Sequence, residues 1–313
     1  LSHSAWTQQA RLVASDAAAF DLFGFSVAID GAVKVGFSAA DRPARIVVGA
    51  PGHAHPDHII DTDMSFNQSV GAAYVFERQL LRSASDYGSL NDTRHPDDSA
   101  GSGRYEWVEV QRLMPQDAPH DDYGWGFGHS VAVHQDVVAV SAPQESSGDG
   151  AVYIYHLENN DGDSDADSWV EIQRLSSPNV ALPDFIKNAS VAELYGASVV
   201  IENDLMAIAA PGMYNGLGAV FLYEWVDDLH AADSARYGDR DSFNQSSQYR
   251  HFSYLQRILY PGVTSASSPA AEQSASSGFG LSVALTGDYV VVGAPTDLDG
   301  VGQAFVYAKR PDS

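Results

Sequence analysis

The residues best suited to chemistry lie in one short motif of the form H-x-H-x-D-H, which contains His53, His55, Asp57 and His58. Imidazole nitrogens and a carboxylate oxygen are common zinc ligands, and bound zinc can activate a water molecule for hydrolysis. Spacings of two and three residues also let histidines converge in a turn, where they would hold a structural or adventitious metal ion. The third interpretation, which we favour, is a solvated polar loop that holds no metal.

A second set of candidate ligands is a run of aspartates at every second position. Carboxylate oxygens in this alternation are similar to the opening of a calcium-binding loop. The EF-hand form is incomplete, because Ala166 stands at the sixth position instead of glycine and Ile172 at the twelfth instead of glutamate. The run predicts either a weak calcium site or a flexible acidic hairpin tip. Its members are Asp161, Asp163, Asp165 and Asp167.

A third candidate combines acidic and aromatic residues in the segment that contains Asp121, Asp122, Tyr123 and Trp125. Aromatic rings stack on sugar rings, and carboxylates accept hydrogen bonds from sugar hydroxyl groups. The segment predicts a ligand-binding site for a carbohydrate, or alternatively a loop folded over a channel mouth. No Ser-His-Asp order, glycine-rich phosphate loop or catalytic pair of carboxylates stands out. We therefore expect no enzymatic activity and no required cofactor, with zinc or calcium binding as the alternative.

Four types of short segment recur along the chain and must position these candidates. The first type reads FGFSVAID, FGHSVAVH, YGASVVIE and FGLSVALT, starting at Phe23, Phe127, Tyr195 and Phe279. The second type is an apolar run that ends at Pro51, Pro143, Pro211 and Pro295. The third type reads GAAYVFE, GAVYIYH, GAVFLYE and GQAFVYA, and the fourth reads WVEVQRL, WVEIQRL and FSYLQRI.

Each type has the features of a β-strand, because it is short, rich in Val, Ile, Tyr and Phe, and bounded by turn residues. Four strands that recur as a set predict an all-β fold, a β-propeller of four four-stranded blades. We expect a single domain over residues 1–313. Its blades lie at about 23–113, about 127–175, about 195–258 and about 279–309.

The two ends of the repeat array suggest how the propeller closes. Residues 6–12 read WTQQARL, a fourth-type strand with no blade before it, and the last blade lacks a fourth strand. We therefore expect this N-terminal strand to complete blade 4 and to remove an exposed sheet edge. The alternative is a piece of a larger propeller of roughly six to eight blades.

The fourth-type strand carries an arginine in every copy, and recurrence in every blade indicates a structural role. We expect these arginines to lie along a neighbouring strand or to pair with an acid. They are Arg11, Arg112, Arg174 and Arg257. The tryptophans of the same strand, Trp6, Trp107 and Trp169, are expected to pack between blades.

These segments resemble the FG-GAP repeat family, which integrin α-subunit propellers share, in the variant with W-x-x-x-x-[KR]-L, F-G-x-S-V-A and V-V-G-A-P strands. The resemblance implies a propeller of about seven blades. Integrin-like repeats often carry a calcium loop between their first two strands, but here residues 134–136 and 286–288 leave no room for one. The H-x-H-x-D-H spelling also resembles the zinc motif of the metallo-β-lactamase fold, whose further ligands a propeller does not supply.

Composition narrows the partners and the compartment. A formal net charge of -24 argues against nucleic acid as a partner. No apolar run approaches the roughly 18 residues of a membrane helix, so we expect no membrane insertion. The chain has no cysteine. Four N-x-[ST] sequons predict glycosylation and a secreted protein whose signal peptide has been removed. They lie at Asn67, Asn91, Asn188 and Asn244.

The sequence thus favours a non-enzymatic module, extracellular or at the cell surface, that acts in adhesion or as a surface or filament glycoprotein. It would bind protein partners through loops on one propeller face, and assembly into a larger oligomer or filament is compatible with it. Two alternatives stay open. One is a lectin-like propeller that binds glycans, and the other is a metal-dependent hydrolase that uses the H-x-H-x-D-H loop.

Overall fold

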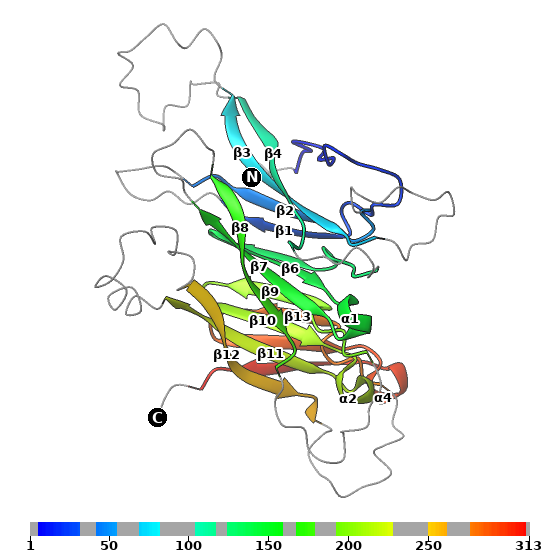
Figure 1. Ribbon diagram of the computed structural model, residues 1–313. Helices are drawn as coiled ribbons and strands as arrows, with labels where there is room; N and C mark the ends of the chain where they lie inside the picture. The colour runs from blue at the N-terminus through cyan, green and yellow to red at the C-terminus, as the bar shows by residue number, and fades with distance from the viewer. Residues whose placement is uncertain are drawn as a thin grey trace, which may run out of the picture.

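The computed structural model describes residues 6–31, 42–54, 69–81, 104–116, 124–158, 167–178, 192–227, 250–261 and 276–310. These residues form antiparallel β-sheets and three one-turn helices (Figure 1). The all-β fold with four propeller blades is confirmed. In the described part of the chain, no helix is long and apolar enough to cross a membrane.

Each blade is one sheet whose strands follow in chain order. Blade 1 contains β1 (Ser26–Asp30), β2 (Arg45–Ala50), β3 (Ala72–Leu81) and β4 (Arg104–Leu113). Blade 2 contains β5 (Val131–His134), β6 (Val137–Ala142), β7 (Ala151–Glu158) and β8 (Ser168–Ser176). Blade 3 contains β9 (Ser198–Glu202), β10 (Leu205–Ala210), β11 (Ala219–Asp227) and β12 (Arg250–Leu259). Blade 4 contains β13 (Ser282–Leu285), β14 (Tyr289–Ala294) and β15 (Gln303–Ala308).

A short helix follows the second strand in three of the blades. These helices are α1 (Glu145–Gly148), α2 (Met213–Gly216) and α4 (Asp297–Gly300), and each includes three residues with positive φ, the last of them a glycine. In blade 1 a longer connection runs from Asp30 to Arg45, and its residues 32–41 lie outside the described residues. In blades 2, 3 and 4 the first and second strands are joined by tight turns, as expected for blades 2 and 4, with Gln135 at φ +54° in blade 2. These turns are too short for a calcium loop of the integrin type.

Blades pack on each other through two unlike faces, because alternate residues of a strand point to opposite sides of its sheet. The face toward the preceding blade carries an edge-to-face aromatic pair, and we call it the large face. The face toward the following blade carries mainly Ala and Val, and we call it the small face. The large-face pairs are Phe23–Tyr74, Phe127–Tyr153, Tyr195–Phe221 and Phe279–Phe305, with ring centroids 5.4 to 5.6 Å apart.

Three buried interfaces follow from this arrangement. The large face of blade 2 covers Val47 and Val75 on the small face of blade 1. Blades 2 and 3 meet in a second apolar cluster, and blades 3 and 4 meet in a third. Contacts between first strands run from β1 to β5, from β5 to β9 and from β9 to β13. The four sheets therefore form a row, with blade 1 at one end and blade 4 at the other (Figure 1).

A glycine before each third strand permits this close packing. A Cβ atom on Gly71 would lie 2.1 Å from the carbonyl oxygen of Phe127, and one on Gly150 would lie 2.2 Å from that of Tyr195. Both glycines have positive φ, which other residues adopt only with strain. The recurring F-G and G-A elements are therefore the two sides of one backbone contact between neighbouring blades.

The expected closure of the ring by residues 6–12 requires correction. These residues form no strand, and the sheet of blade 4 has three strands in the described part of the chain. Leu12 and Ala14 pack instead on blade 1, and Ser15 donates hydrogen bonds from its amide and hydroxyl groups to Glu109. Residues 6–12 cannot reach blade 4 in this arrangement, because the packed interfaces of the row place β15 at the end away from blade 1.

Candidate functional site

A cluster of ionisable residues lies at one end of blade 1, where the chain leaves β2. His53 Nδ1 lies 3.2 Å from Asp21 Oδ2 and 3.3 Å from the hydroxyl oxygen of Tyr74. Tyr74 donates a 2.8 Å hydrogen bond to Asp16, which also forms an ion pair with Arg112. Both His53 and Asp21 are buried. The cluster ties the N-terminal segment to three strands of the blade.

The pKa shifts of Asp16 and Tyr74 suit a structural role of this cluster. Burial alone would raise the pKa of Asp16, but hydrogen bonds from Tyr74 and Arg112 outweigh it and the pKa is lowered. Burial and the hydrogen bond to Asp16 raise the pKa of Tyr74 far above its usual range. Asp16 therefore stays charged and Tyr74 stays protonated at neutral pH. Neither is poised to exchange a proton near pH 7, as a general acid or base must.

Blades 2 and 3 contain counterparts of the same cluster. In blade 2, Tyr153 donates a 2.8 Å hydrogen bond to Glu145, and Arg174 pairs with the same carboxylate. In blade 3, Arg257 donates to the hydroxyl group of Tyr214. In both of these blades the arginine of the fourth strand contacts the turn that follows the second strand, whereas Arg112 of blade 1 pairs with Asp16 of the N-terminal segment. This recurrence indicates that the arginines fasten the outer strand to its own blade.

The structure describes only some of the predicted metal ligands. His53 is engaged by Asp21 and Tyr74, while His55, Asp57 and His58 lie outside the described residues. Asp161, Asp163 and Asp165 also lie outside them. Over the described ranges, no group of three or more His, Cys, Asp or Glu residues could hold a metal ion. Zinc and calcium binding stay predictions for the segments that contain these residues.

Only one of the four residues of the predicted carbohydrate site belongs to the described part of the chain. Asp121, Asp122 and Tyr123 lie outside the described residues, whereas Trp125 lies in the interface between blades 1 and 2 with an exposed fraction of 4%. A buried ring cannot stack on a sugar without a rearrangement of the interface, so its position favours a packing role. The sequons Asn67, Asn91, Asn188 and Asn244 all lie outside the described residues.

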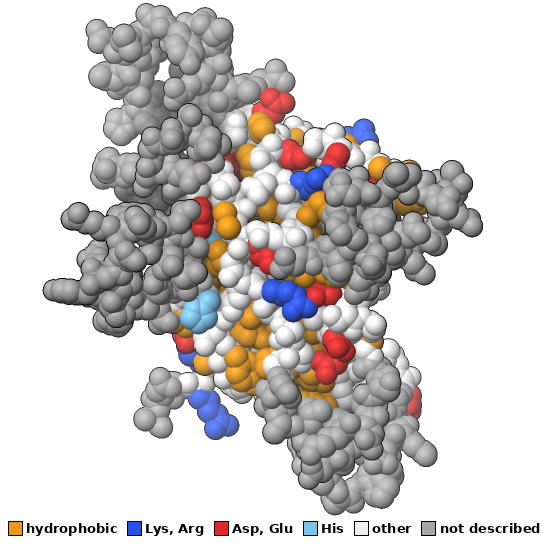
Figure 2. Space-filling model, viewed as in Figure 1, with side chains coloured by type: hydrophobic (Ala, Val, Ile, Leu, Met, Phe, Trp, Pro, Cys, Tyr) orange, Lys and Arg blue, Asp and Glu red, His pale blue; other side chains and the backbone are white. Residues whose placement is uncertain are grey.

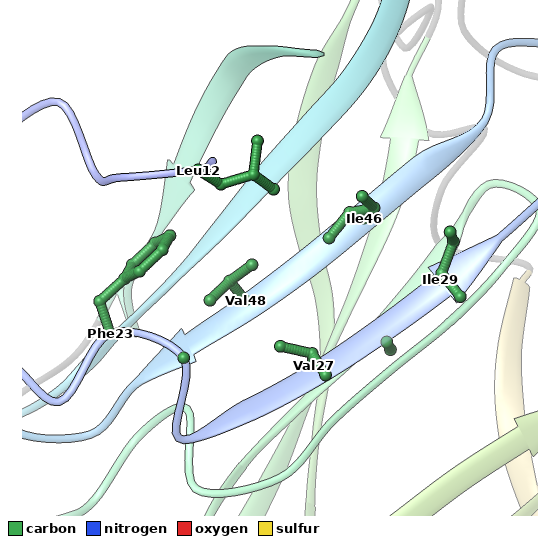
Figure 3. Close-up of a pocket in the computed structure, with 8 residues that line it drawn as sticks. Leu12, Phe23, Val27, Ile29, Ile46 and Val48 are labelled. Atoms are coloured by element: carbon green, nitrogen blue, oxygen red, sulfur yellow. The ribbon is translucent and has the colours of Figure 1, made fainter. Parts of the chain in front are cut away.

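An apolar groove on the large face of blade 1 is a concave feature that the sequence did not predict. It has a volume of about 480 Å³ and is lined by Leu12, Phe23, Gly24, Val27, Ala28, Ile29, Ile46 and Val48 (Figure 3). Val27 is 69% exposed, whereas its counterpart Val131 in blade 2 is 6% exposed. No ionisable side chain lines the groove, so it is suited to bind apolar surface and not to perform acid–base chemistry. The repeats could have indicated this groove, because Val27 occupies a position that is buried in blades 2 and 3 by the preceding blade.

A charged clasp joins blade 1 to blade 2 at the end of their first hairpins. Arg45 lies 2.8 Å from both Glu77 and Asp136, and Arg42 lies 3.0 Å from Asp136. Burial alone would raise the pKa of Asp136, but the hydrogen bond from Arg45 and the charges of both arginines lower it. The clasp therefore fixes the two blades most firmly when Asp136 is ionised.

Charged side chains elsewhere on the visible face are spread out, with no extended basic patch among the residues drawn in colour (Figure 2). Repeated blades, recurring arginine clusters and an apolar end groove together define a propeller module built from equivalent units. Residues 6–76, 107–155 and 269–307 match the family model described as FG-GAP repeat. These segments make up half of the chain, and the chain belongs to the FG-GAP repeat family. No curated protein matches it.

Proposed function

We propose that this propeller is a non-enzymatic interaction module, extracellular or at the cell surface, that binds protein partners through the segments connecting its strands. The observation that carries the proposal is the use of the ionisable residues in the described core. Asp16, Glu145 and Asp136 are each held by an arginine within a blade or between blades. Groups committed to packing in this way support a scaffold and leave binding to its surface.

The location rests on the sequence. Four sequons in a chain with a net charge of -24 support a secreted, soluble and acidic glycoprotein. FG-GAP repeats occur in integrin-like propellers, which supports a role in adhesion or surface structure.

Glycosylation can be tested by expressing the chain with a secretion signal in mammalian cells. We expect a loss of mass on treatment with an N-glycosidase and a smaller loss in each Asn→Gln variant of an occupied sequon. Secretion without any glycan on Asn67, Asn91, Asn188 or Asn244 would contradict the glycoprotein part of the proposal.

Binding can be tested on arrays of extracellular proteins and of glycans probed with the labelled chain. We expect saturable binding to proteins that is reduced when residues 228–249 are replaced by a Gly-Ser linker, with the far-UV circular dichroism unchanged. A matched replacement of residues 82–103 shows which connection carries the contact. Binding to glycans alone, lost in Trp125→Ala, would support the lectin instead. Zinc-dependent hydrolysis lost in His55→Ala would support an enzyme.

A further inference from the structure

The two ends of the row expose opposite halves of the interface that occurs three times inside it. At one end the large face of blade 1 is open, with its groove and its aromatic pair Phe23–Tyr74. At the other end the small face of blade 4 is open, where Val306 is 66% exposed and its counterpart Val75 in blade 1 is fully buried. Each internal interface joins one large face to one small face. The open faces are therefore complementary to each other.

The N-terminal segment has the sequence of a fourth-type strand, although residues 6–12 form no strand in the single chain. The family match over residues 107–155 starts in β4 of blade 1 and ends in β7 of blade 2, so one repeat spans two sheets. The match over residues 6–76 starts at the equivalent strand. The amide group of Gln116 donates to Glu171 in blade 2, and the amide group of Ser15 donates in the same way to Glu109 in blade 1. Residues 6–12 therefore belong to a blade that precedes blade 1.

In the described part of the chain, the sheet of blade 4 has no fourth strand of the kind that residues 6–12 would provide, and a buried carboxylate lies next to that position. Asp297 stands at the position that Glu145 occupies in blade 2, immediately after the second strand and its turn. Glu145 is held by Arg174. Asp297 Oδ1 accepts a hydrogen bond from the hydroxyl group of Tyr260, but Asp297 Oδ2 has no hydrogen-bond partner among the described residues, although Asp297 is only 6% exposed. Arg11 holds the equivalent place to Arg174 in the sequence WTQQARL. A docked N-terminal strand would bring this arginine to Asp297.

The glycine before the third strand also indicates that blade 4 lacks a following blade in the single chain. Gly71, Gly150 and Gly218 each lie against the first-segment aromatic residue of the next blade. Gly302 has the same positive φ, but its nearest neighbours belong to Pro295 of its own blade. The residue that would occupy the empty position is Phe23 at the start of blade 1.

We propose that a second copy of this chain occupies both open ends. The small face of blade 4 in each copy packs on the large face of blade 1 in the other, and residues 6–12 of each copy pair with β15 of the other. Two rows of four blades then form a closed ring of eight, which lies within the usual range of propellers. A second copy satisfies both ends without changing the three packed interfaces, whereas closure within one chain would require every interface to tilt.

The register of the new strand pair follows from the three complete blades. Val75 stands opposite Gln111, Ile154 opposite Gln173 and Leu222 opposite Gln256, and a β-bulge follows each pair at the same place. The equivalent residues at the open ends are Val306 in β15 and Ala10 in the N-terminal strand. Directly opposed residues in antiparallel strands are within the reach of a disulfide bond.

The cysteine-free chain makes this register testable by cross-linking. We would mix Ala10→Cys chains with Val306→Cys chains, oxidise the mixture mildly and measure mass under denaturing, non-reducing conditions. We expect a disulfide-linked pair of chains. The matched control is Thr7→Cys with Val306→Cys, which is displaced by about 7 Å along the strand and is expected to cross-link at least tenfold less.

Two outcomes would overturn the proposal. The first is a cross-link within single chains of an Ala10→Cys/Val306→Cys double variant, with none in the mixture, which would show that one chain closes its own ring. The second is the absence of any cross-link above the Thr7→Cys control, which would show that residues 6–12 do not dock on β15.

A charge exchange tests the contact between Arg11 and Asp297 independently. Arg11→Asp alone and Asp297→Arg alone place like charges together at both junctions, so each should weaken association at least about tenfold. An equimolar mixture of the two variants restores an opposite pair at each junction, and we expect it to sediment as two-copy particles. A mixture that sediments like the separate variants would contradict the pairing.

Discussion

The three internal interfaces and the two end faces are built from the same positions of the repeat and differ only in what covers them. Ile201 on the large face of blade 3 is buried, while Ile29 at the same position of blade 1 is exposed. The aromatic pair of the large face has the same edge-to-face geometry in all four blades. The two end faces therefore have the composition and internal packing of buried faces, as expected if a second copy of the chain covers them.

The largest expected effect separates an internal glycine from its counterpart at the open end. Gly150→Ala would place a Cβ atom 2.2 Å from the carbonyl oxygen of Tyr195 at positive φ, so we expect a loss of more than about 3 kcal/mol of stability. In the single-copy state, Gly302→Ala meets its nearest atom at 3.1 Å and should cost about 1 kcal/mol of backbone strain. Urea unfolding at low protein concentration measures both. Equal losses of stability in Gly150→Ala and Gly302→Ala would contradict the expected difference between the internal and the open position.

The next effect compares one residue type at one repeat position. Ile201→Ala removes buried methyl groups between blades 2 and 3 and should cost about 3 kcal/mol. Ile29→Ala at the open end should cost less than about 1 kcal/mol in the single-copy state, because its side chain is already in contact with water. Thermal unfolding at several protein concentrations checks this, and the cost of Ile29→Ala should grow as copies associate.

A smaller effect concerns the clasp between blades 1 and 2. Because the pKa of Asp136 is lowered from its ordinary 3.8, the clasp contributes its full stability above that pH and loses it as the pH falls through the lower folded-state pKa. Asp136→Asn should cost about 1 kcal/mol at neutral pH, since Asp136 is partly exposed and solvent screens the pair. Urea unfolding at neutral and acidic pH tests the sign. A cost that increases toward acidic pH would contradict it.

The smallest effect is expected from metal removal. The tight turns between the first and second strands of blades 2, 3 and 4 leave no room there for an integrin-type calcium loop, so a chelator should shift the unfolding temperature by less than about 1 °C. Calorimetry with and without EDTA measures the shift. Stabilisation by added calcium would instead support a site at the aspartate run, and Asp163→Asn would locate it.

The sequence was sufficient to predict the strands and their order, because each segment has the hydrophobic pattern of a strand and is bounded by turn residues. Pro51 and Pro143 mark the ends of β2 and β6, and the recurrence of four segments gave the four blades. The site depended on contacts between distant residues. His53 meets Asp21 and Tyr74 through the packing of a loop on a sheet, and no local pattern indicates that meeting.

The closure was mispredicted for a similar reason. The motif in residues 6–12 located the start of a repeat, since the family match begins at residue 6, although these residues form no strand in the structure. A motif does not say whether the blade that receives the strand lies in the same chain. That depends on the angle accumulated over three packed interfaces, which is a property of the row and not of any segment.

The most direct test is the mass of the native particle. The chain, produced without glycans in a bacterial host, would be measured by sedimentation equilibrium over a range of micromolar concentrations. The account predicts a particle of about 67 kDa, twice the 33.5 kDa of one chain, that returns toward one chain in Val306→Glu but not in Val110→Glu on the outer strand of blade 1. A particle of 33.5 kDa at every concentration would contradict it.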